Sequence, residues 1–169
     1  MTKGLYSTTF EKDACGIGFI AQINNKTSHS IVKDGLIMLK NMEHRGGVAA
    51  DGETGDGAGI LTQIPLKYFK REALKQGVIL PETGGYGVGM IFLPNEAEKV
   101  EKGLRLIDDA INEMGLRNVW LRKVPVASDK IGSIARDSEP KIFQVFVKSN
   151  ELSVHELERK LFVLRKLCQ

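Results

Sequence analysis

The sequence predicts a protein of the α/β or α+β class, in which strands are covered by helices. Short apolar runs of strand length alternate along the chain with stretches that have the 3.6-residue period of amphipathic helices. A further observation concerns one common fold within this class, the Rossmann fold. The glycine-rich segments lack the spacing of a dinucleotide-binding fingerprint, so nothing in the sequence favours a Rossmann fold.

Each element follows from its own pattern. In chain order, the elements are strand, helix, strand, helix, strand, helix, strand, strand and helix. Strands are expected where apolar residues are continuous or alternate, over residues 15–24, 60–64, 86–93, 118–126 and 141–148. Helices are expected where apolar residues recur on one face, over residues 28–43, 65–76, 96–114 and 153–169. The polar residues 128–139 are expected to form a loop with one helical turn.

Residues that cap helix N-termini precede three of these helices. Ser28 or Ser30 can cap the first, and Asn95 can cap the third. Ser153 is followed three residues later by glutamate, the pattern of a capping box. The apolar stripe of the last helix is still in phase at Gln169, which is the pattern of a truncated chain.

Composition excludes several classes of partner. The 169 residues suffice for one domain, and the net charge of +3, from 24 basic and 21 acidic residues, is too small and too scattered for a nucleic-acid-binding protein. The sequence has no apolar run of membrane-spanning length and no signal peptide, so no membrane partner is expected. Its two cysteines form no disulfide framework, which favours a cytoplasmic location.

Cys15 stands at the head of the first expected strand and is a candidate nucleophile. If residues 1–14 were removed as a leader peptide, its α-amine, with a pKa near ~8, would lie on the same residue as the thiol. One residue would then supply both nucleophile and base, as in N-terminal threonine enzymes. The simpler alternative is that Cys15 is a small buried apolar residue, the usual role of a free cysteine.

Two glycine-rich loops follow the first expected helix. That helix ends in Glu43-His44-Arg45-Gly46-Gly47, where the two glycines allow another group to approach the backbone closely. His44 and Arg45 also suit the negative end of the helix dipole, which alone is enough to explain them. Residues 53–59 are rich in glycine and acidic residues but lack the spacing of a phosphate-binding loop.

The residues alone leave two interpretations open. In one, the protein is an enzyme with Cys15 as nucleophile, Arg45 nearby and the glycine loops shaping a pocket. In the other, it is a binding, regulatory or scaffold domain whose cysteine is inert. No metal site is expected, because the three histidines lack ligand spacing with a cysteine or acidic pair, and no GxSxG motif is present.

Three stretches taken together resemble the N-terminal amidotransferase domain of the glutamate synthase large subunit, a class II glutamine amidotransferase. They are residues 10–19 (FEKDACGIGF), 39–47 (LKNMEHRGG) and 54–61 (TGDGAGIL), and residues 157–166 are also similar to the family. The resemblance implies a fold of the α+β class, a four-layer αββα sandwich of the N-terminal-nucleophile (Ntn) hydrolase type. It further implies a propeptide at residues 1–14, and at residues 15–169 the first part of the amidotransferase domain.

The same resemblance implies a mechanism and a set of site residues. Cys15, freed as residue one, would attack the side-chain amide of glutamine, and a thioester would be hydrolysed to glutamate. Arg45, Gly46 and Gly47 would shape the site or bind substrate, and Asp56 would order the turn beside it. The ammonia would pass to 2-oxoglutarate elsewhere in the large subunit.

The chain also departs from the family. The family's Asn-Gly oxyanion-hole pair is absent, and Asn-Gly occurs nowhere in the sequence. One missing oxyanion donor costs about 10²–10³ in rate, so the chain alone is expected to be nearly inactive. The resemblance implies no cofactor in this chain and assigns the parent's FMN and iron–sulfur cluster to its other domains. The expected partners are glutamine and the remainder of the large subunit.

Overall fold

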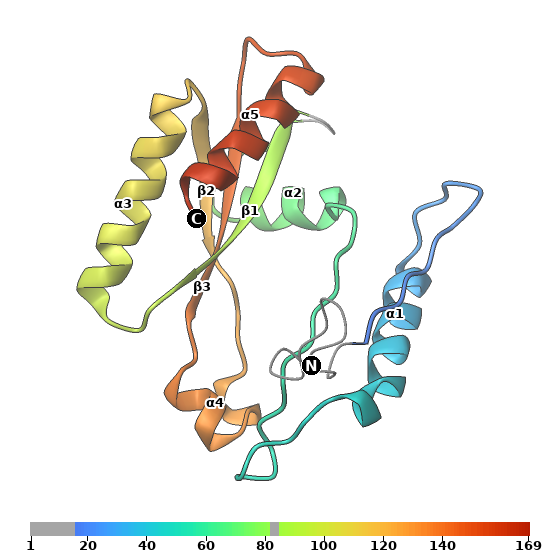
Figure 1. The fold of residues 1–169 in the computed structure, drawn as a ribbon. Coiled ribbons are helices and arrows are strands. Elements are labelled where there is room, and N and C mark those ends of the chain that lie inside the picture. Colours follow the sequence, from blue (N-terminus) through green and yellow to red (C-terminus); the bar gives the residue numbers. More distant parts are fainter. Residues whose placement is uncertain (1–15, 82–84) are drawn as a thin grey trace, which may run out of the picture. The chain divides into compact units, whose positions relative to one another are not determined.

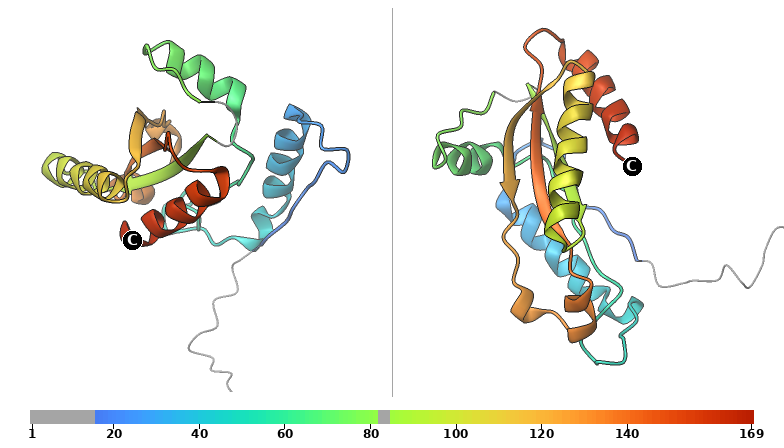
Figure 2. Two further views of the ribbon diagram at one scale, coloured as in Figure 1. Left: turned by 90° about the horizontal axis from the view of Figure 1, so that it is seen from above. Right: turned by 90° about the vertical axis from the view of Figure 1, so that its left-hand side faces the viewer.

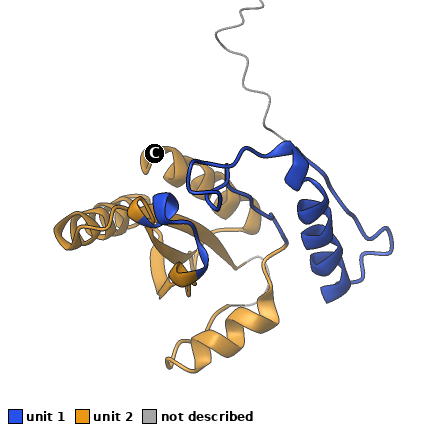
Figure 3. Cartoon of the chain, turned by 90° about the horizontal axis from the view of Figure 1, so that it is seen from below, with its two compact units in different colours: residues 1–62, 130–136 blue, residues 63–129, 137–169 orange. Residues whose placement is uncertain are grey.

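The computed structural model describes residues 16–81 and 85–169 (Figure 1). The chain falls into two compact units, coloured separately in Figure 3. Unit 1 comprises Met1–Thr62 and Lys130–Arg136, and unit 2 comprises Gln63–Asp129 and Asp137–Gln169. Cys15 and the proposed propeptide lie outside the described residues.

Unit 2 is built on a three-stranded antiparallel sheet. Its strands are β1 (Tyr86–Leu93), β2 (Arg117–Lys123) and β3 (Lys141–Lys148), in the order β1-β3-β2. At one end of the sheet, Lys148 of β3 lies opposite Tyr86 of β1 and Arg117 of β2. Val145, Phe146 and Val147 of β3 are apolar in succession because both faces of the sheet are covered there.

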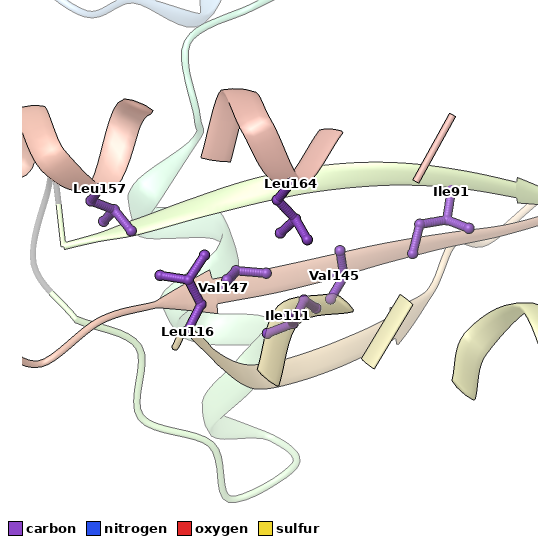
Figure 4. Packing of buried hydrophobic residues seen from close by; sticks show 7 residues of the cluster. All are labelled: Ile91, Ile111, Leu116, Val145, Val147, Leu157 and Leu164. Atoms are coloured by element: carbon purple, nitrogen blue, oxygen red, sulfur yellow. The ribbon is translucent and has the colours of Figure 1, made fainter. Parts of the chain in front are cut away.

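One face of the sheet is covered by α3 (Ala97–Glu113) and α5 (Val154–Leu167). Val145 and Val147 of β3 pack here against Ile111 of α3 and against Leu157 and Leu164 of α5 (Figure 4). Successive strand side chains point to opposite faces, so residues 145 and 147 share this face while residue 146 points to the other.

The other face is covered by α2 (Leu66–Leu74), which Figure 2 shows on the side of the sheet away from α3 and α5. Phe146 is fully buried here, with its ring centroid 5.0 Å from that of Phe69 and 4.7 Å from that of Trp120. The indole N–H of Trp120 donates to Gln76 Oε1 at 2.9 Å, so this largely apolar cluster leaves the indole nitrogen paired.

Unit 1 contains α1 (His29–Asn41), the 3₁₀ turn η2 (Glu43–Arg45), and residues 133–136 of α4 (Ser133–Asp137). Ser28 caps α1 by accepting a hydrogen bond from Ser30 N at 3.1 Å. Among the described residues, none of the buried hydrophobic residues belongs to unit 1. Hydrogen bonds of Asp51, Thr54 and Asp56 connect its described segments.

The α+β class is confirmed, and the last three expected strands are found. The capping box also forms at α5, where Ser153 N donates to Glu156 Oε2 at 2.9 Å and Glu156 N donates back to Ser153 Oγ. The loop expected over residues 128–139 contains the 3₁₀ turn η3 (Ser128–Lys130) and α4. The described residues hold one sheet, so the αββα sandwich stays a prediction.

Two expected strands are wrong in the described part of the chain. Residues 16–24 and 60–64 form no strand. The side chains of Ile17 and Leu61 are 98% and 100% exposed, and no neighbouring strand pairs with either segment. A strand is stabilised by its partners, so an apolar pattern without a paired neighbour does not fix one. The cap of α3 also differs: it falls on Glu96, not Asn95.

Candidate functional site

The end of α1 leads directly into the first glycine pair. Met42 N donates to Leu39 O at 3.0 Å, and Gly46 N donates to Glu43 O at 3.1 Å, which closes η2. His44 Nδ1 donates to Asn41 O at 2.9 Å, so this ring satisfies a carbonyl at the end of α1. Arg45 is exposed, one residue before the glycines.

Residues 47–56, here called the glycine hairpin, connect the two glycine-rich motifs. At its base, Gly47 N donates to Asp56 Oδ2 at 2.7 Å. Val48 then pairs with Gly55, and Ala49 N donates to Thr54 O at 2.7 Å. The structure therefore brings Gly47 and Asp56 into direct contact, although they are nine positions apart in the sequence.

Glycine at position 47 is explained by the close approach of Asp56. A Cβ added there would lie 3.2 Å from Asp56 Oδ2, which is tighter than ordinary van der Waals contact. The same carboxylate oxygen accepts the Gly47 N–H. A larger residue at 47 would push the carboxylate away and weaken the hydrogen bond that closes the hairpin.

The segment that follows Cys15 runs beside α1. A Cβ added at Gly16 would lie 3.0 Å from Met42 Sδ, and one at Gly18 would collide with Met38 Sδ. Gly16 is therefore next to the residue that immediately precedes η2. The chain just after the candidate nucleophile thus lies near the start of the His44-Arg45-Gly46-Gly47 segment.

Asp51, at the tip of the glycine hairpin, was missed by the sequence reasoning. Its Oδ1 accepts hydrogen bonds from Glu53 N at 3.1 Å and Thr54 N at 2.8 Å, and its Oδ2 accepts one from Thr54 Oγ1 at 2.6 Å. These bonds hold the pKa of Asp51 well below its usual range, and the bond from the Thr54 hydroxyl has the largest effect. The Asp51-Gly52 pair is the sequence signal that could have predicted this turn. Gly52 has a φ of +71° in the structure.

The low pKa of Asp51 has a testable consequence. A carboxyl whose folded pKa is lowered stabilises the fold fully above its unfolded pKa, about 4, and loses that effect as the pH falls towards the folded value. NMR signals of the Thr54 and Ile134 amides should therefore stay unchanged from pH 7 down to about 4. Asp51→Asn is the control that cannot titrate. A transition of these two amides centred near pH ~4, where an unperturbed carboxyl titrates, would contradict the assignment.

Other chemistry has little support in the part of the chain that the structure describes. No group of three or more His, Cys, Asp and Glu residues there is arranged to hold a metal ion. Cys168, at the end of α5, is exposed at its surface, yet partial burial raises the pKa of its thiol. A thiol with a raised pKa is a poorer nucleophile at neutral pH. None of the described helices is long and apolar enough to cross a bilayer.

Comparison with known proteins identifies the family. The sequence profile described as "Glutamine amidotransferases class-II" matches residues 15–169. The chain is 44% identical over 169 residues to the glutamate synthase [NADPH] large chain of Bacillus subtilis, covering 99% of this chain and 11% of that protein. It is 42% identical over 160 residues to ferredoxin-dependent glutamate synthase 1, chloroplastic/mitochondrial, of Arabidopsis thaliana, covering 94% and 10%.

A third relative is the glutamate synthase [NADH] of Schizosaccharomyces pombe, 36% identical over 171 residues, which cover 97% of this chain and 8% of that protein. The chain thus spans about a tenth of the length of these curated relatives. Its similarity to them covers nearly all of its own sequence and includes both glycine-rich motifs. This chain belongs to the class-II glutamine amidotransferases and is homologous to part of the glutamate synthase large chain.

Proposed function

We propose that this chain provides the nucleophile and the first loops of the glutaminase site of a glutamate synthase, within an Ntn-hydrolase sandwich. The site would hydrolyse glutamine to glutamate and ammonia, and the ammonia would be transferred to 2-oxoglutarate. The family match over residues 15–169 carries this proposal, and it begins at Cys15. The contact between Gly47 and Asp56, which joins the two glycine-rich motifs, supports it.

The proposed reaction begins when residues 1–14 are removed and Cys15 becomes the N-terminus. The freed α-amine accepts the thiol proton, and the sulfur attacks the side-chain amide carbon of glutamine. The tetrahedral intermediate collapses as the C–N bond breaks and the leaving nitrogen takes up that proton, releasing ammonia. Water then hydrolyses the thioester, which yields glutamate and regenerates the thiol.

The loop residues have supporting roles in this proposal. Arg45 supplies a positive charge beside the nucleophile, and Gly46 and Gly47 let the backbone approach the substrate. Gly47 N–H is already donated to Asp56 Oδ2, so we do not assign it to the oxyanion. Asp56 orders the hairpin through that bond instead of binding glutamine.

The hydrogen-bond donors that stabilise the oxyanion would come from residues other than Arg45, Gly46, Gly47 and Asp56. The sequence contains no Asn-Gly pair, and we propose that the 169-residue chain by itself turns over glutamine slowly. The FMN and iron–sulfur cluster of the parent enzyme are likewise assigned to its other domains, where they would supply the electrons for glutamate formation. No step proposed for this chain's residues uses either group.

A hybrid enzyme tests the proposal. The segment of the Bacillus subtilis large chain that matches this chain is replaced by it, giving what we call the hybrid large chain. Mass spectrometry should find Cys15 as its N-terminal residue, and the hybrid should release glutamate and ammonia from glutamine. A diazoketone analogue of glutamine should modify Cys15 stoichiometrically.

The opposite results would favour the non-catalytic alternative. If residues 1–14 stay attached and the glutamine analogue leaves Cys15 unmodified, the chain keeps the fold without the chemistry. It would then be a regulatory or scaffold domain.

A further inference from the structure

The tip of the glycine hairpin is tied to a segment about eighty residues away in the sequence. Asp51 Oδ2 accepts hydrogen bonds from Ile134 N at 3.1 Å and from Ser133 Oγ at 3.4 Å. Thr54 Oγ1 accepts one from Ala135 N at 3.1 Å. Both partners belong to unit 1, so this junction is internal to one compact unit.

Asp51 divides its two oxygens between two tasks. Oδ1 accepts only the amides of the hairpin's own turn, Glu53 and Thr54. Oδ2 accepts the bonds from the distant residues together with the Thr54 hydroxyl. The negative charge strengthens each of these bonds, because a hydrogen bond to an ionised group is roughly twice as strong as one between neutral groups.

Gly132 allows the distant segment to come this close. It is buried, and a Cβ added there would collide with Thr54 Oγ1 and lie 2.5 Å from Asp51 Oδ2 and 2.7 Å from Thr54 N. The last of these atoms is backbone, so the clash is not relieved by rotating a side chain. Only glycine at 132 fits against the hairpin as it stands.

Apart from the hydrogen bonds of Gly47 and Ala49 described above, few interactions stabilise the hairpin. Its apolar residue Val48 is 67% exposed, and its ladder consists of one isolated bridge. An isolated two-stranded hairpin is marginally stable in water. The junction at Asp51 is therefore a main constraint on the position of the hairpin. It thereby also constrains Gly47 and Gly46, which directly precedes the hairpin.

We propose that Asp51 and Gly132 are positioning residues of the glutaminase site, acting through the glycine hairpin. This inference rests on the proposed function, because it assumes that Gly46 and Gly47 face glutamine. Neither Asp51 nor Gly132 touches substrate. Their effect is to fix the loop that does.

Two variants of the hybrid large chain disturb the junction from opposite sides. Asp51→Asn keeps an oxygen for the Glu53 and Thr54 amides but turns an NH₂ donor towards Ile134 N–H. Gly132→Ala brings a Cβ against Thr54 and Asp51 Oδ2 and so forces the hairpin and the distant segment apart. Asp129→Asn, which makes the same change at an exposed carboxylate three positions before Gly132 in the sequence, is the matched control.

The expected signature is a split between binding and turnover. Both variants should raise the KM for glutamine about tenfold, the effect of losing one or two hydrogen bonds to a charged group, with kcat within about threefold of the unmodified hybrid. Labelling of Cys15 by the glutamine analogue should slow by a similar factor, while labelling by iodoacetamide should not. Asp129→Asn should match the unmodified hybrid in KM, in kcat and in both labelling rates.

The outcomes separate the two proposals. An unmodified hybrid without glutaminase activity would overturn the proposed function itself. If the unmodified hybrid is active but both junction variants keep its KM, or lose kcat at unchanged KM, Asp51 and Gly132 do not position the site. The ratio of the Cys15 labelling rates with the glutamine analogue and with iodoacetamide measures the geometry of the site in whichever variant folds.

Discussion

Replacing Cys15 by serine in the hybrid large chain is expected to abolish glutamine hydrolysis, with kcat/KM falling by at least about 10³-fold. The thiolate is the nucleophilic form of cysteine, and an α-amine with a pKa near ~8 can generate it at neutral pH. The serine hydroxyl is far less acidic, so the same amine activates it poorly. Glutamate release from glutamine, followed by an enzymatic glutamate assay, measures the loss.

Cys168→Ser is the matched control for this experiment. It makes the same sulfur-to-oxygen change at the other cysteine of the chain, which lies at the end of α5. Burial raises the pKa of that thiol, so it is mostly protonated at neutral pH and contributes nothing to the proposed reaction. Activity should stay within about twofold of the unmodified hybrid. If Cys15→Ser kept the activity of the unmodified hybrid, as Cys168→Ser should, Cys15 would be excluded as the nucleophile.

The elements of unit 2 were predictable because their signals are local. Val145, Phe146 and Val147 form a continuous apolar run, and all three are buried because helices cover both faces of the sheet. Ser153 and Glu156 lie within one turn of each other, so their capping box can be recognised without knowing the fold.

The two wrong strand predictions show where such signals end. Residues 16–24 and 60–64 have the composition of strands, but a strand also needs a partner, and partner choice is not written in the segment itself. Ile23, within the first of these segments, is 97% exposed in the structure. Pairing between distant segments is therefore the information that periodicity lacks.

The residues of the candidate site also fall into two groups, those that the sequence indicated and those that only the structure shows. The resemblance pointed to Arg45, Gly46, Gly47 and Asp56, and the structure places Asp56 against Gly47, while the role of all four in glutamine binding stays a prediction. Gly132 could not be found from the sequence, because its neighbours Asp51 and Thr54 are about eighty residues away. A lone glycine before a short helix reads as a loop residue until that contact is seen.

Phe146→Ala is expected to produce the largest loss of stability, about 3–5 kcal/mol in the free energy of unfolding of unit 2. Phe146 is 0% exposed at the centre of the sheet, where its ring contacts the rings of Phe69, Tyr86 and Trp120. Removing the ring takes apolar surface out of a packed cluster and leaves a cavity that β3, hydrogen-bonded on both sides, cannot collapse to fill.

Trp120 makes this prediction measurable, because it is the only tryptophan in the sequence and its ring centroid lies 4.7 Å from that of Phe146. Its fluorescence during urea unfolding reports on this cluster directly. Phe92→Ala is the matched control: Phe92 lies on β1 of the same sheet but is 62% exposed, so its truncation should cost less than about 1 kcal/mol. Similar midpoints for the two variants would mean that the cluster around Phe146 does not hold unit 2 together.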